Sequence, residues 1–546
     1  MEPTHHPMNY LLLGVGFTLV ALLQALYRRY TRISIRHVPG PPSDSFLLGN
    51  MREFHHRPVA EADFKWQEEY GNIVRFKAAF GEDRLLVMDP KALQYIYQTA
   101  GYNFPKPKER REMSRIISGS GILSAESSDH KRHRKVLLPG FGGPESRAFW
   151  PIFYGYATQL TSKWKDIISS SPNQEVVVDI PRWTSRAMLD AIGEAAFDYQ
   201  FGAMENAETP LSLAYFGLLA KTFGSLTDSA IFVQNLWAYL PAKCLRIVSN
   251  YSPGLTLKHA RSTERIATDV AKKLIQTKTE ELRHGAGNRD IMSLLVKANN
   301  SENAGAKLSE NELYAQMRTI MLAGHETTAN TVSWTLLELS RHPEMQRRLR
   351  EEIWAKQLDL GREFEARDLE SMPYLQAVVK ESLRFHPVAP MTHREAGRDD
   401  VLPLSKPITL TTGEVVHELP IPKGQKLALS IAGYNRNKDI FGEDSHVFNP
   451  DRWLSNSPKN AVNVGVYSNL LTFAGGLRAC IGFRFALLEF QAFLVELVGT
   501  YEFSLTEESK KIRREPCGVM APFVEGQTDK EAHLPLRITL ATKGEE

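Results

Sequence analysis

Apolar residues recur at helical spacing along most of the chain, and this pattern predicts a mainly helical protein. The longest periodic stretch covers residues 311–340 and is rich in leucine, methionine, alanine and tryptophan. Shorter periodic stretches occur elsewhere, at residues 345–353, 483–490 and 489–498. Strand-like patterns are few and short, and they lie at residues 73–75, 85–87 and 408–416. The fold class that follows is mainly α with a small β region.

The N-terminal pattern differs from the rest because one apolar stretch carries no charge. Residues 8–27 contain no charged side chain, and arginines follow directly at positions 28, 29, 32 and 36. Twenty helical residues span about 30 Å, which is the thickness of a bilayer core. Arginines beside a first membrane segment stay in the cytosol, so the tail before it is expected in the lumen. A cleaved signal peptide is the alternative, but no small-x-small site precedes the arginines.

The expected organisation is one membrane anchor and one large domain. Residues 1–7 form a lumenal tail, residues 8–27 a transmembrane signal anchor, and residues 28–45 a basic hinge with the sequence Pro-Gly-Pro-Pro at 39–42. We find no convincing linker, repeat or low-complexity block in the sequence after the hinge. Residues 46–546 are therefore predicted to form a single domain, although length alone would allow several.

The composition indicates a cytosol-facing domain and argues against nucleic acid as a partner. The 546 residues are 42% hydrophobic and 24% charged, an ordinary globular mixture with ample core. The three cysteines are few and widely spaced, which argues against a disulfide framework and fits a reducing, cytosol-facing domain. The formal net charge is only +3, and no basic tract is interleaved with aromatic residues, so no nucleic acid is expected as a partner.

One cysteine lies in the most informative motif of the chain, at residues 473–482. Phe473, Gly476, Arg478, Cys480 and Gly482 occupy its characteristic positions. A thiolate is a strong electron donor to heme iron and favours O–O cleavage. The glycines permit close backbone approach, the arginine can hold a heme propionate, and the following helix would turn its positive N-terminus toward the sulfur. A buried cysteine in a glycine-rich turn is the alternative.

Three further patterns add candidate residues. Residues 323–328, Ala-Gly-His-Glu-Thr-Thr, lie in the middle of the longest periodic stretch, where glycine and threonine weaken a helix; a kinked core helix is the alternative explanation. Glu381 and Arg384 share one helix face and can pair, although such pairs are usually solvated. His130 and Arg134 also share a face, with a plain basic surface helix as the alternative.

Together these motifs resemble those of the cytochrome P-450 superfamily, the heme-thiolate monooxygenases. Residues 473–482 are similar to its heme-binding signature, and residues 323–328 are similar to its distal helix over the oxygen site. Residues 448–453 resemble the aromatic-Pro-Arg segment, with Asn449 where the family often has glutamate. The landmarks follow the family order over nearly the whole chain, and their style resembles that of a fungal microsomal member.

The resemblance implies a role for individual residues. Cys480 is the axial ligand of heme b, iron protoporphyrin IX, and Glu326 and Thr327 relay protons to bound oxygen. Ala323 and Gly324 leave room for O2. The other residues expected around the heme are His130, Arg134, Arg394 or its neighbour His393, Phe473, Gly476, Arg478 and Gly482. The residues expected in a purely structural triad are Glu381, Arg384 and Arg452.

The resemblance also implies the reaction and its setting. Such an enzyme inserts one oxygen atom from O2 into a lipophilic small molecule, for which a terpenoid-like secondary metabolite is favoured. Electrons come from NADPH through NADPH–cytochrome P-450 reductase, with cytochrome b5 as an optional donor. The implied location is the endoplasmic reticulum membrane, crossed once, with a cytosolic catalytic domain. Two alternatives stay open: a heme-thiolate isomerase, dehydratase or peroxygenase that needs no reductase, and a non-enzymatic heme sensor or carrier.

Overall fold

The computed structural model describes residues 33–205, 210–215, 218–224, 226–251, 255–284, 290–301, 306–454, 462–527 and 531–542. The lumenal tail and the membrane anchor, predicted at residues 1–7 and 8–27, lie outside the described residues. Within the described ranges, no helix has both the length and the apolar character needed to cross a bilayer.

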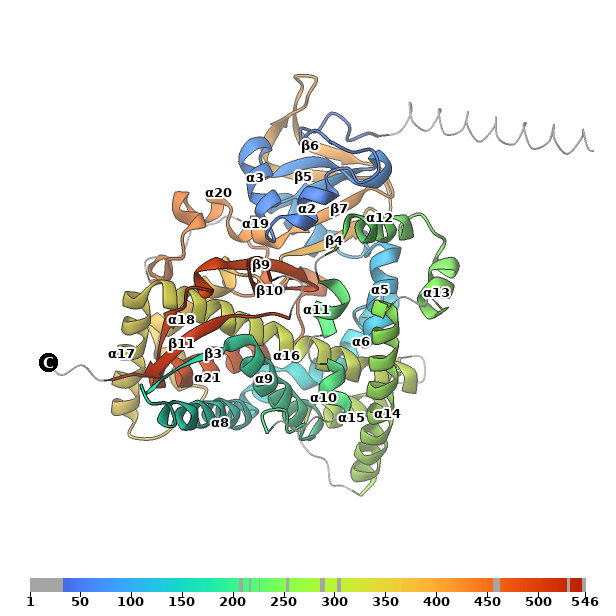
Figure 1. Ribbon diagram of the computed structural model, residues 1–546. Coiled ribbons are helices and arrows are strands. Elements are labelled where there is room, and N and C mark those ends of the chain that lie inside the picture. The colour runs from blue at the N-terminus through green and yellow to red at the C-terminus, as the bar shows by residue number, and fades with distance from the viewer. Residues whose placement is uncertain are drawn as a thin grey trace, which may run out of the picture.

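Helices make up most of the molecule, as the apolar periodicity predicts (Figure 1). The helices of the first half are α2 (Met51–His56), α3 (Glu61–Tyr70), α4 (Pro90–Gln94), α5 (Lys108–Ser118), α6 (Ser127–Leu137), α7 (Gly143–Ala148), α8 (Trp150–Ser169) and α9 (Ile180–Phe197). The middle of the chain carries α10 (Pro210–Tyr215), α11 (Leu218–Phe223), α12 (Asp228–Trp237), α13 (Ala242–Tyr251), α14 (Leu255–Arg283) and α15 (Ile291–Ser301). The remaining helices are α16 (Glu310–Arg341), α17 (Pro343–Leu360), α18 (Pro373–Phe385), α19 (Ile431–Asn435), α20 (Lys438–Phe441) and α21 (Phe483–Thr500).

The β region consists of small sheets. A four-stranded sheet has the order β1 (Ile73–Lys77), β2 (Asp83–Val87), β7 (Lys426–Ser430) and β4 (Met391–Glu395). A three-stranded sheet has the order β3 (Glu175–Asp179), β11 (Pro535–Leu540) and β8 (Tyr501–Leu505). Two hairpins complete the β structure, β5 (Asp400–Thr409) with β6 (Val415–Ile421) and β9 (Ile512–Cys517) with β10 (Val519–Val524). The strands β4, β5, β6 and β7 lie together at one end of the molecule (Figure 1).

One strand prediction was wrong. Residues 408–416 were expected to form one strand, but they contain the end of β5, a turn and the start of β6. The backbone closes the turn through a hydrogen bond of 2.8 Å from the Leu410 N–H to the Glu414 carbonyl. Gly413 has a φ of 86°, a conformation that glycine adopts without strain. Apolar residues on both sides of a turn therefore imitated one continuous strand.

The long helix α16 has a clear start and a continuous course. Ser309 and Glu312 form a reciprocal capping box at its N-terminus, which satisfies two backbone donors. Its bounds match the predicted stretch 311–340 within one residue at each end. The hydroxyls of Thr327 and Thr331 donate to the carbonyl four residues earlier, and the helix continues without a break.

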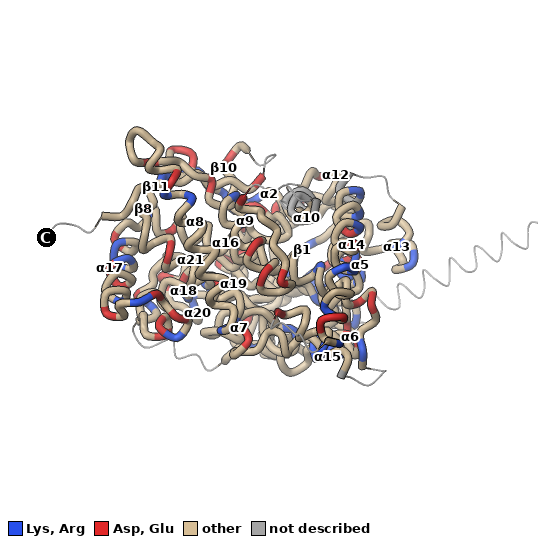
Figure 2. The backbone as a smooth tube through the Cα atoms, turned by 90° about the horizontal axis from the view of Figure 1, so that it is seen from below, with Lys and Arg blue, Asp and Glu red and all other residues tan. Residues whose placement is uncertain are grey.

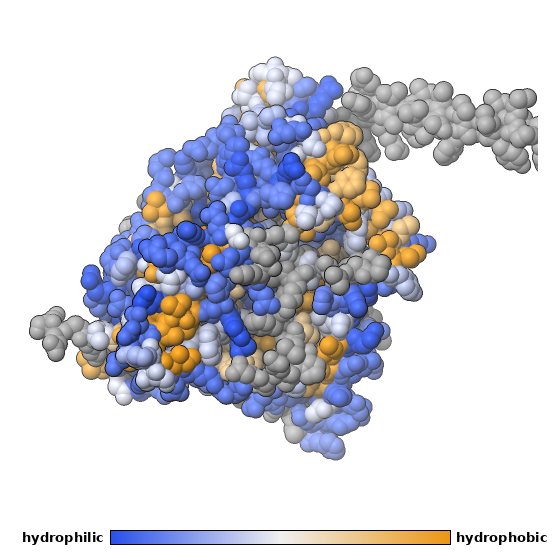
Figure 3. Space-filling model, in the orientation of Figure 1, coloured by the Kyte–Doolittle hydropathy of each residue, from blue (hydrophilic) through white to orange (hydrophobic). Residues whose placement is uncertain are grey.

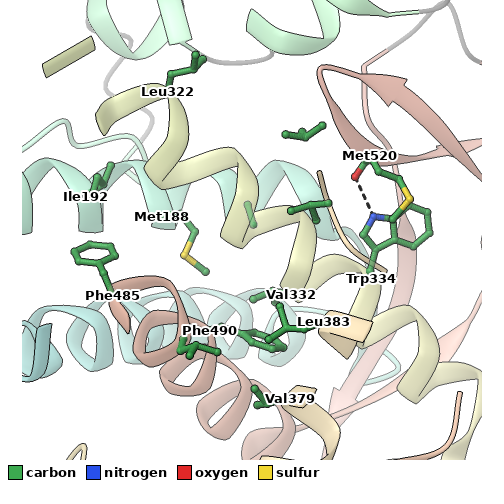
Figure 4. Packing of buried hydrophobic residues seen from close by; sticks show 14 of the residues in the cluster. Met188, Ile192, Leu322, Val332, Trp334, Val379, Leu383, Phe485, Phe490 and Met520 are labelled. Atoms are coloured by element: carbon green, nitrogen blue, oxygen red, sulfur yellow. Dashed lines mark hydrogen bonds between the residues drawn. The ribbon is translucent and has the colours of Figure 1, made fainter. Parts of the chain in front are cut away.

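The core forms where α16 packs against α9 and α21 packs against α8. Gly324 permits the first contact, because a Cβ at this position would lie 2.6 Å from Cγ1 of Ile192 on α9. The indole N–H of Trp334 donates to the Met520 carbonyl of β10 at 3.1 Å. Figure 4 shows side chains of five elements meeting here, among them Met188, Ile192, Leu322, Val332, Trp334, Val379, Leu383, Phe485, Phe490 and Met520.

The segment expected to be a hinge is partly docked on the β region. Ile35 and Val38 are buried, and the Arg75 N–H donates to the Pro39 carbonyl at 2.9 Å. Gly40 lies so close to β1 that a Cβ there would be 1.7 Å from the Arg75 carbonyl oxygen. The folded domain therefore includes residues from about 35 onward rather than from 46, because only a chain without a side chain at position 40 can pass β1 this closely.

Charged residues of both signs lie along the outer helices, as Figure 2 shows for α17 and α14. The central part of α16 is mostly uncharged in the same view. This distribution matches a protein that carries its functional site inside rather than on a strongly charged surface.

Candidate functional site

The backbone folds tightly around Cys480, just before α21. The Cys480 N–H donates to the Phe473 carbonyl at 2.8 Å, which closes the loop that the motif predicts. The Cys480 side chain is accessible, although surrounding protein raises the pKa of its thiol by burial. A hydrogen bond from the Gly482 N–H and the positive charge of Arg134 act in the opposite direction. Metal ligation needs the thiolate, and these two groups favour it.

Neighbouring protein atoms require glycine at position 476 of this loop but not at position 482. Gly476 has a φ of 60°, and a Cβ there would lie 1.9 Å from the carbonyl oxygen of Tyr97. A Cβ at Gly482 would meet the ring of Phe141 at 3.5 Å, which is ordinary contact. The sequence led us to expect that these glycines permit close approach of the backbone to the heme; the structure shows that Gly476 also lets the cysteine loop pass the Tyr97 backbone.

One face of α16 is accessible although its surroundings are buried. Ala323 is exposed and Thr327 is half-buried, and they lie four residues apart on the same side of the helix. The Thr327 hydroxyl donates to the Ala323 carbonyl at 2.7 Å, so the hydroxyl stands on this accessible face. Gly324, which was expected to leave room for O2, has its side-chain direction filled by Ile192 and serves helix packing. Ala323 is the residue of this pair that the structure leaves open.

Glu326 borders a cavity of about 500 Å³ whose walls carry both polar and apolar residues. The cavity lies between the start of α9, the middle of α16 and the turn between β9 and β10, and its walls include Arg182, Asn330, Cys517 and His533. Burial, with the charges of Glu515 and Glu326, raises the pKa of the Cys517 thiol to about 12, so this cysteine stays protonated. Glu326 thus lies next to Thr327 in sequence and borders this cavity at the same time.

His325 does not join the accessible face. Its side chain is fully buried, and its Nδ1 lies 2.7 Å from the Met321 carbonyl oxygen. Burial lowers its pKa to about 4. The structure therefore places His325 as a packing residue of the helix.

Cationic side chains gather beside the cysteine loop. Arg478 pairs with Glu126, but its Nε and Nη1 are buried and have no hydrogen-bond partner among the described residues. Arg394 is 6% exposed, and burial lowers its pKa. The charges of Arg478 and Glu126 act on Arg394, which shows that β4 brings it to this cluster. His393 points to the other face of β4. Of these two neighbours, Arg394 is therefore the candidate for binding a heme propionate.

The two predicted residues of α6 also reach this cluster. Arg134 Nη1 donates to the Ala479 carbonyl at 2.8 Å, immediately before Cys480. His130 Nδ1 lies 3.0 Å from the Tyr102 hydroxyl, and burial followed by the charge of Arg478 lowers its pKa to about 3. His130 is therefore a neutral hydrogen-bonding group at neutral pH.

The sequence did not identify Lys106, Tyr102 and Glu126 as members of the same cluster. Burial lowers the pKa of Lys106 to about 7, and Glu126 raises it. Lys106 Nζ lies 3.7 Å from a Glu126 carboxylate oxygen. No local motif marks these residues, because they come together only when α6, β4 and the cysteine loop pack.

The cluster fits a group with carboxylates on an apolar body. It contains three arginines and a lysine but one carboxylate, Glu126, and two nitrogens of Arg478 remain unpaired in a buried place. Buried donors without partners are costly, and additional carboxylates would satisfy them. The propionates and the iron of heme therefore match the cationic cluster and the accessible Cys480.

The predicted triad is assembled at the C-terminal end of α18. Glu381 and Arg384 are both fully buried, and Arg384 Nη2 donates to Glu381 Oε1 at 2.7 Å. Arg452 Nε lies 3.2 Å from the same oxygen. The Trp453 indole and the Asn449 backbone N–H also donate to Glu381, at 2.9 and 2.7 Å. Asn449 thus contributes through its backbone, where the family's usual residue type is not needed.

Comparison with known proteins gives a consistent result. The family model described as Cytochrome P-450 matches residues 39–527. A protein named cytochrome P-450 monooxygenase 205, from Postia placenta, is 33% identical over 96% of this chain and 97% of its own length. A ganoderic acid synthetase from Ganoderma lucidum is 33% identical over 90% and 93%. A cytochrome P-450 monooxygenase from Ampulloclitocybe clavipes is 31% identical over 95% of each chain. These relatives are fungal, as the motifs predict.

Proposed function

The chain belongs to the cytochrome P-450 family and is a monooxygenase of the oxidoreductase class, and we propose that it inserts one oxygen atom from O2 into a lipophilic, terpenoid-like secondary metabolite. The observation that carries the proposal is the accessible Cys480 beside a buried cationic cluster with unpaired donors. One relative is named for the synthesis of an acid, ganoderic acid, which fits a role in making specialised small molecules.

Each part of the site has a distinct task in this reaction. Cys480 would ligate the heme iron, and Arg478, Arg394, Arg134 and His130 would hold the propionates. When bound, heme supplies the activation of O2 and the oxidising power. Thr327 holds a hydroxyl on the accessible face of α16, where it can donate a proton. Glu326 can be resupplied with protons through the cavity that it borders.

Oxygen uptake with purified components tests the proposed function against its two alternatives. A monooxygenase consumes O2 only when NADPH and NADPH–cytochrome P-450 reductase are both present, with cytochrome b5 as an optional second donor. An isomerase, dehydratase or peroxygenase would turn over without the reductase. A heme sensor or carrier would bind ligands without turnover. Reductase-independent turnover, or no turnover with any lipophilic substrate tried, would contradict the proposal.

Thr327→Ala is expected to separate NADPH consumption from product formation. Without the hydroxyl, proton delivery to oxygen fails, and reducing equivalents leave as peroxide. General acid–base groups contribute about 10²–10⁴ to rates, so product per NADPH is expected to fall at least about tenfold while heme content stays constant. The measurement is product and peroxide formed per NADPH.

The control for this variant is Thr331→Ala, one turn further along α16. Its hydroxyl makes the same kind of bond, 2.9 Å to the Thr327 carbonyl, but the residue is buried. Thr327→Ser should retain most coupling because it keeps the hydroxyl. Tight coupling in Thr327→Ala, or equal uncoupling in Thr331→Ala, would remove the relay role from Thr327.

The reductase is proposed to dock near α6. Of the basic residues on this helix, Arg132 is held by Glu312 at 2.6 Å and Arg134 by the Ala479 carbonyl. Lys131 and Lys135 are exposed on the same helix, next in sequence to His130 and Arg134 of the cationic cluster. Complementary charge of this kind steers association more than it determines affinity.

We also propose that the protein is held at the endoplasmic reticulum membrane, with the catalytic domain in the cytosol. The predicted anchor at residues 8–27 is one attachment. A second is an apolar patch formed by Phe46, Val233, Leu236 and Tyr239, all of them exposed. Figure 3 shows hydrophobic residues gathered on the side where α12 lies. The Phe80 ring joins the patch, at 6.3 Å from Phe46 and 5.5 Å from Tyr239.

Val233→Asp with Leu236→Asp is expected to weaken vesicle binding of a form that lacks residues 1–32. Burying an apolar side chain contributes about 1.5–3 kcal/mol, so we expect a loss of at least about tenfold in affinity. These positions are better probes than Phe232, whose ring packs edge to face against Phe80. Leu358→Asp on α17, where the residue is 80% exposed, is the control. Unchanged binding in the double variant would refute the contact.

A further inference from the structure

A cluster of cationic groups lies on the face of the four-stranded sheet that points away from Arg394. His393 pairs with Ala428 of β7, and Ala428 pairs with Leu86 of β2, so these three residues line up on one face. Arg84 lies two residues before Leu86 on β2, so its side chain lies on the same face of the sheet. This face is covered by α2 and α12, because Met51 and Ile231 pack against Leu86 and Ala428.

Helix α5 brings one more arginine to this place. Glu109, in its first turn, pairs with Lys426 at 3.0 Å, and Lys426 lies on the same face of β7 as Ala428. Arg110 follows Glu109 directly and is exposed. Among the residues that the structure describes, none forms an ion pair or side-chain hydrogen bond with the Arg110 guanidinium. An accessible arginine without a partner can accept an external anion.

The electrostatics show that Arg110, Arg84, His55 and His393 belong together. Burial and then the positive charge of Arg110 lower the pKa of His55 to about 4. The same two causes lower the pKa of His393 well below its ordinary value. Although Arg110 is accessible to solvent, desolvation by the protein around it and the charge of Arg84 lower its pKa, and the charge of Glu109 acts in the opposite direction. All the charged groups that shift the pKa values of His55 and His393 are cationic side chains, so the local electrostatic potential is positive.

The carboxylates nearby do not neutralise Arg110. Glu82 is held by Arg84 at 2.6 Å and by Lys426 at 3.4 Å, and Glu109 is held by Lys426. The remaining acid of this sheet face is Glu395, and burial raises its pKa, which favours its uncharged form. Two of the three acids are thus already paired with cations other than Arg110.

We propose that the substrate of this enzyme carries an anionic group, a carboxylate or a similar acid, and that Arg110 binds it while the lipophilic body extends along α5 toward α16. This inference rests on the proposed function and specifies its substrate class. α5 leads to the distal helix, because the Ile122 N–H just beyond it donates to Oε1 of Gln316 on α16 at 3.1 Å. The eight helical steps from Arg110 to Ser118 cover about 12 Å of helix. The oxidised carbon is therefore remote from the acid.

A matched pair of probes tests the proposal on the full chain in nanodiscs. Dodecanoic acid and methyl dodecanoate differ in charge but share the apolar chain. We expect Arg110→Gln to weaken binding of the acid about tenfold, because the variant loses a charge-assisted hydrogen bond to the carboxylate. Binding of the ester, which carries no charge, should change by less than about twofold. The probes also partition into the nanodisc bilayer. This partitioning is the same for all variants at one lipid content, so it does not affect the comparison between them. Affinity is read from calorimetry and, independently, from the heme spin-state shift.

The controls separate this inference from the proposed function. Arg111→Gln, an exposed neighbour on α5, should bind both probes as the unaltered protein does. Arg110→Lys should recover part of the acid affinity, because it restores charge but not the bidentate fork. The carbon monoxide difference spectrum reports heme-thiolate ligation in the same samples. A normal spectrum with equal loss for acid and ester would overturn only the substrate class, whereas an absent thiolate band would overturn the proposed function.

Two other outcomes would also overturn the proposal. One is failure of the unaltered protein to bind the acid. The other is an Arg110→Gln variant that loses sedimentation with phosphatidylserine vesicles but keeps its affinity for the acid, which would identify the ligand of Arg110 as a lipid headgroup.

Discussion

Replacing Cys480 with serine is expected to abolish the strongly red-shifted Soret band of the reduced, carbon monoxide-bound protein and to reduce turnover to background. Only a thiolate gives this band and the electron donation that favours O–O cleavage. Serine keeps the size of the side chain, but its hydroxyl does not ionise near neutral pH. Cys517 is not expected to take over, since it is buried and the pKa of its thiol is raised to about 12.

The matched controls for Cys480→Ser are Cys517→Ser and Cys244→Ser. Cys517 lies at the turn between β9 and β10, and Cys244 is exposed on α13. Both variants should keep the shifted band at full intensity per heme. A band that survives in Cys480→Ser and disappears in Cys517→Ser would show that the ligand had been assigned to the wrong cysteine.

Glu381→Ala is expected to prevent most of the protein from folding, although Glu381 takes no part in the chemistry. Arg384 is fully buried, and its remaining bonds are to carbonyls of Asn435, Ser445 and Val447. Removing one partner of a buried ion pair costs about 3–5 kcal/mol, because the other charge stays uncompensated. Domains are stable by only about 5–15 kcal/mol in total. The expected result is a large loss of soluble protein that contains heme.

Urea unfolding of the full chain in detergent, with heme content measured in parallel, checks this prediction. Glu351→Ala on α17 is the control, because Glu351 forms a long pair of 3.9 Å with Arg347 and both side chains are mostly exposed. Exposed pairs contribute about 0–1 kcal/mol. If Glu381→Ala and Glu351→Ala lowered the unfolding midpoint equally, the buried network would not be a main source of stability.

Much of the fold was predictable because its signals are local. The bounds of α16 follow from the apolar periodicity of residues 311–340. The pairing of Glu381 with Arg384 follows from their spacing on one helix. The hairpin at residues 408–416 was missed because periodicity continued across its turn, and only the backbone at Gly413 reveals the reversal.

For some residues, the role expected from the sequence was revised once the structure showed which atoms surround them. Glycine in a sequence indicates that a side chain would not fit, but it does not indicate what fills the space. At Gly324 the space is taken by Ile192, and at Gly476 by the backbone of Tyr97. Likewise, Arg394 and His393 are equivalent candidates in the sequence, and only the pairing of β4 places them on opposite faces.

The sequence by itself determined the mainly helical class and the family, and it predicted Cys480 as the ligand and Glu326 with Thr327 as the acid–alcohol pair, because these signals depend on apolar periodicity or on residue types at short, fixed spacings. The tertiary structure alone decided which distant residues meet: Lys106 and Glu126 at the heme cluster, and Arg110 with Arg84 and His393 on the sheet face. Such encounters depend on how helices and strands pack across hundreds of residues, and neither periodicity nor motif spacing records that packing. The charge balance around a site is the property that depends most on these encounters, since Coulomb interactions act between neighbours in space.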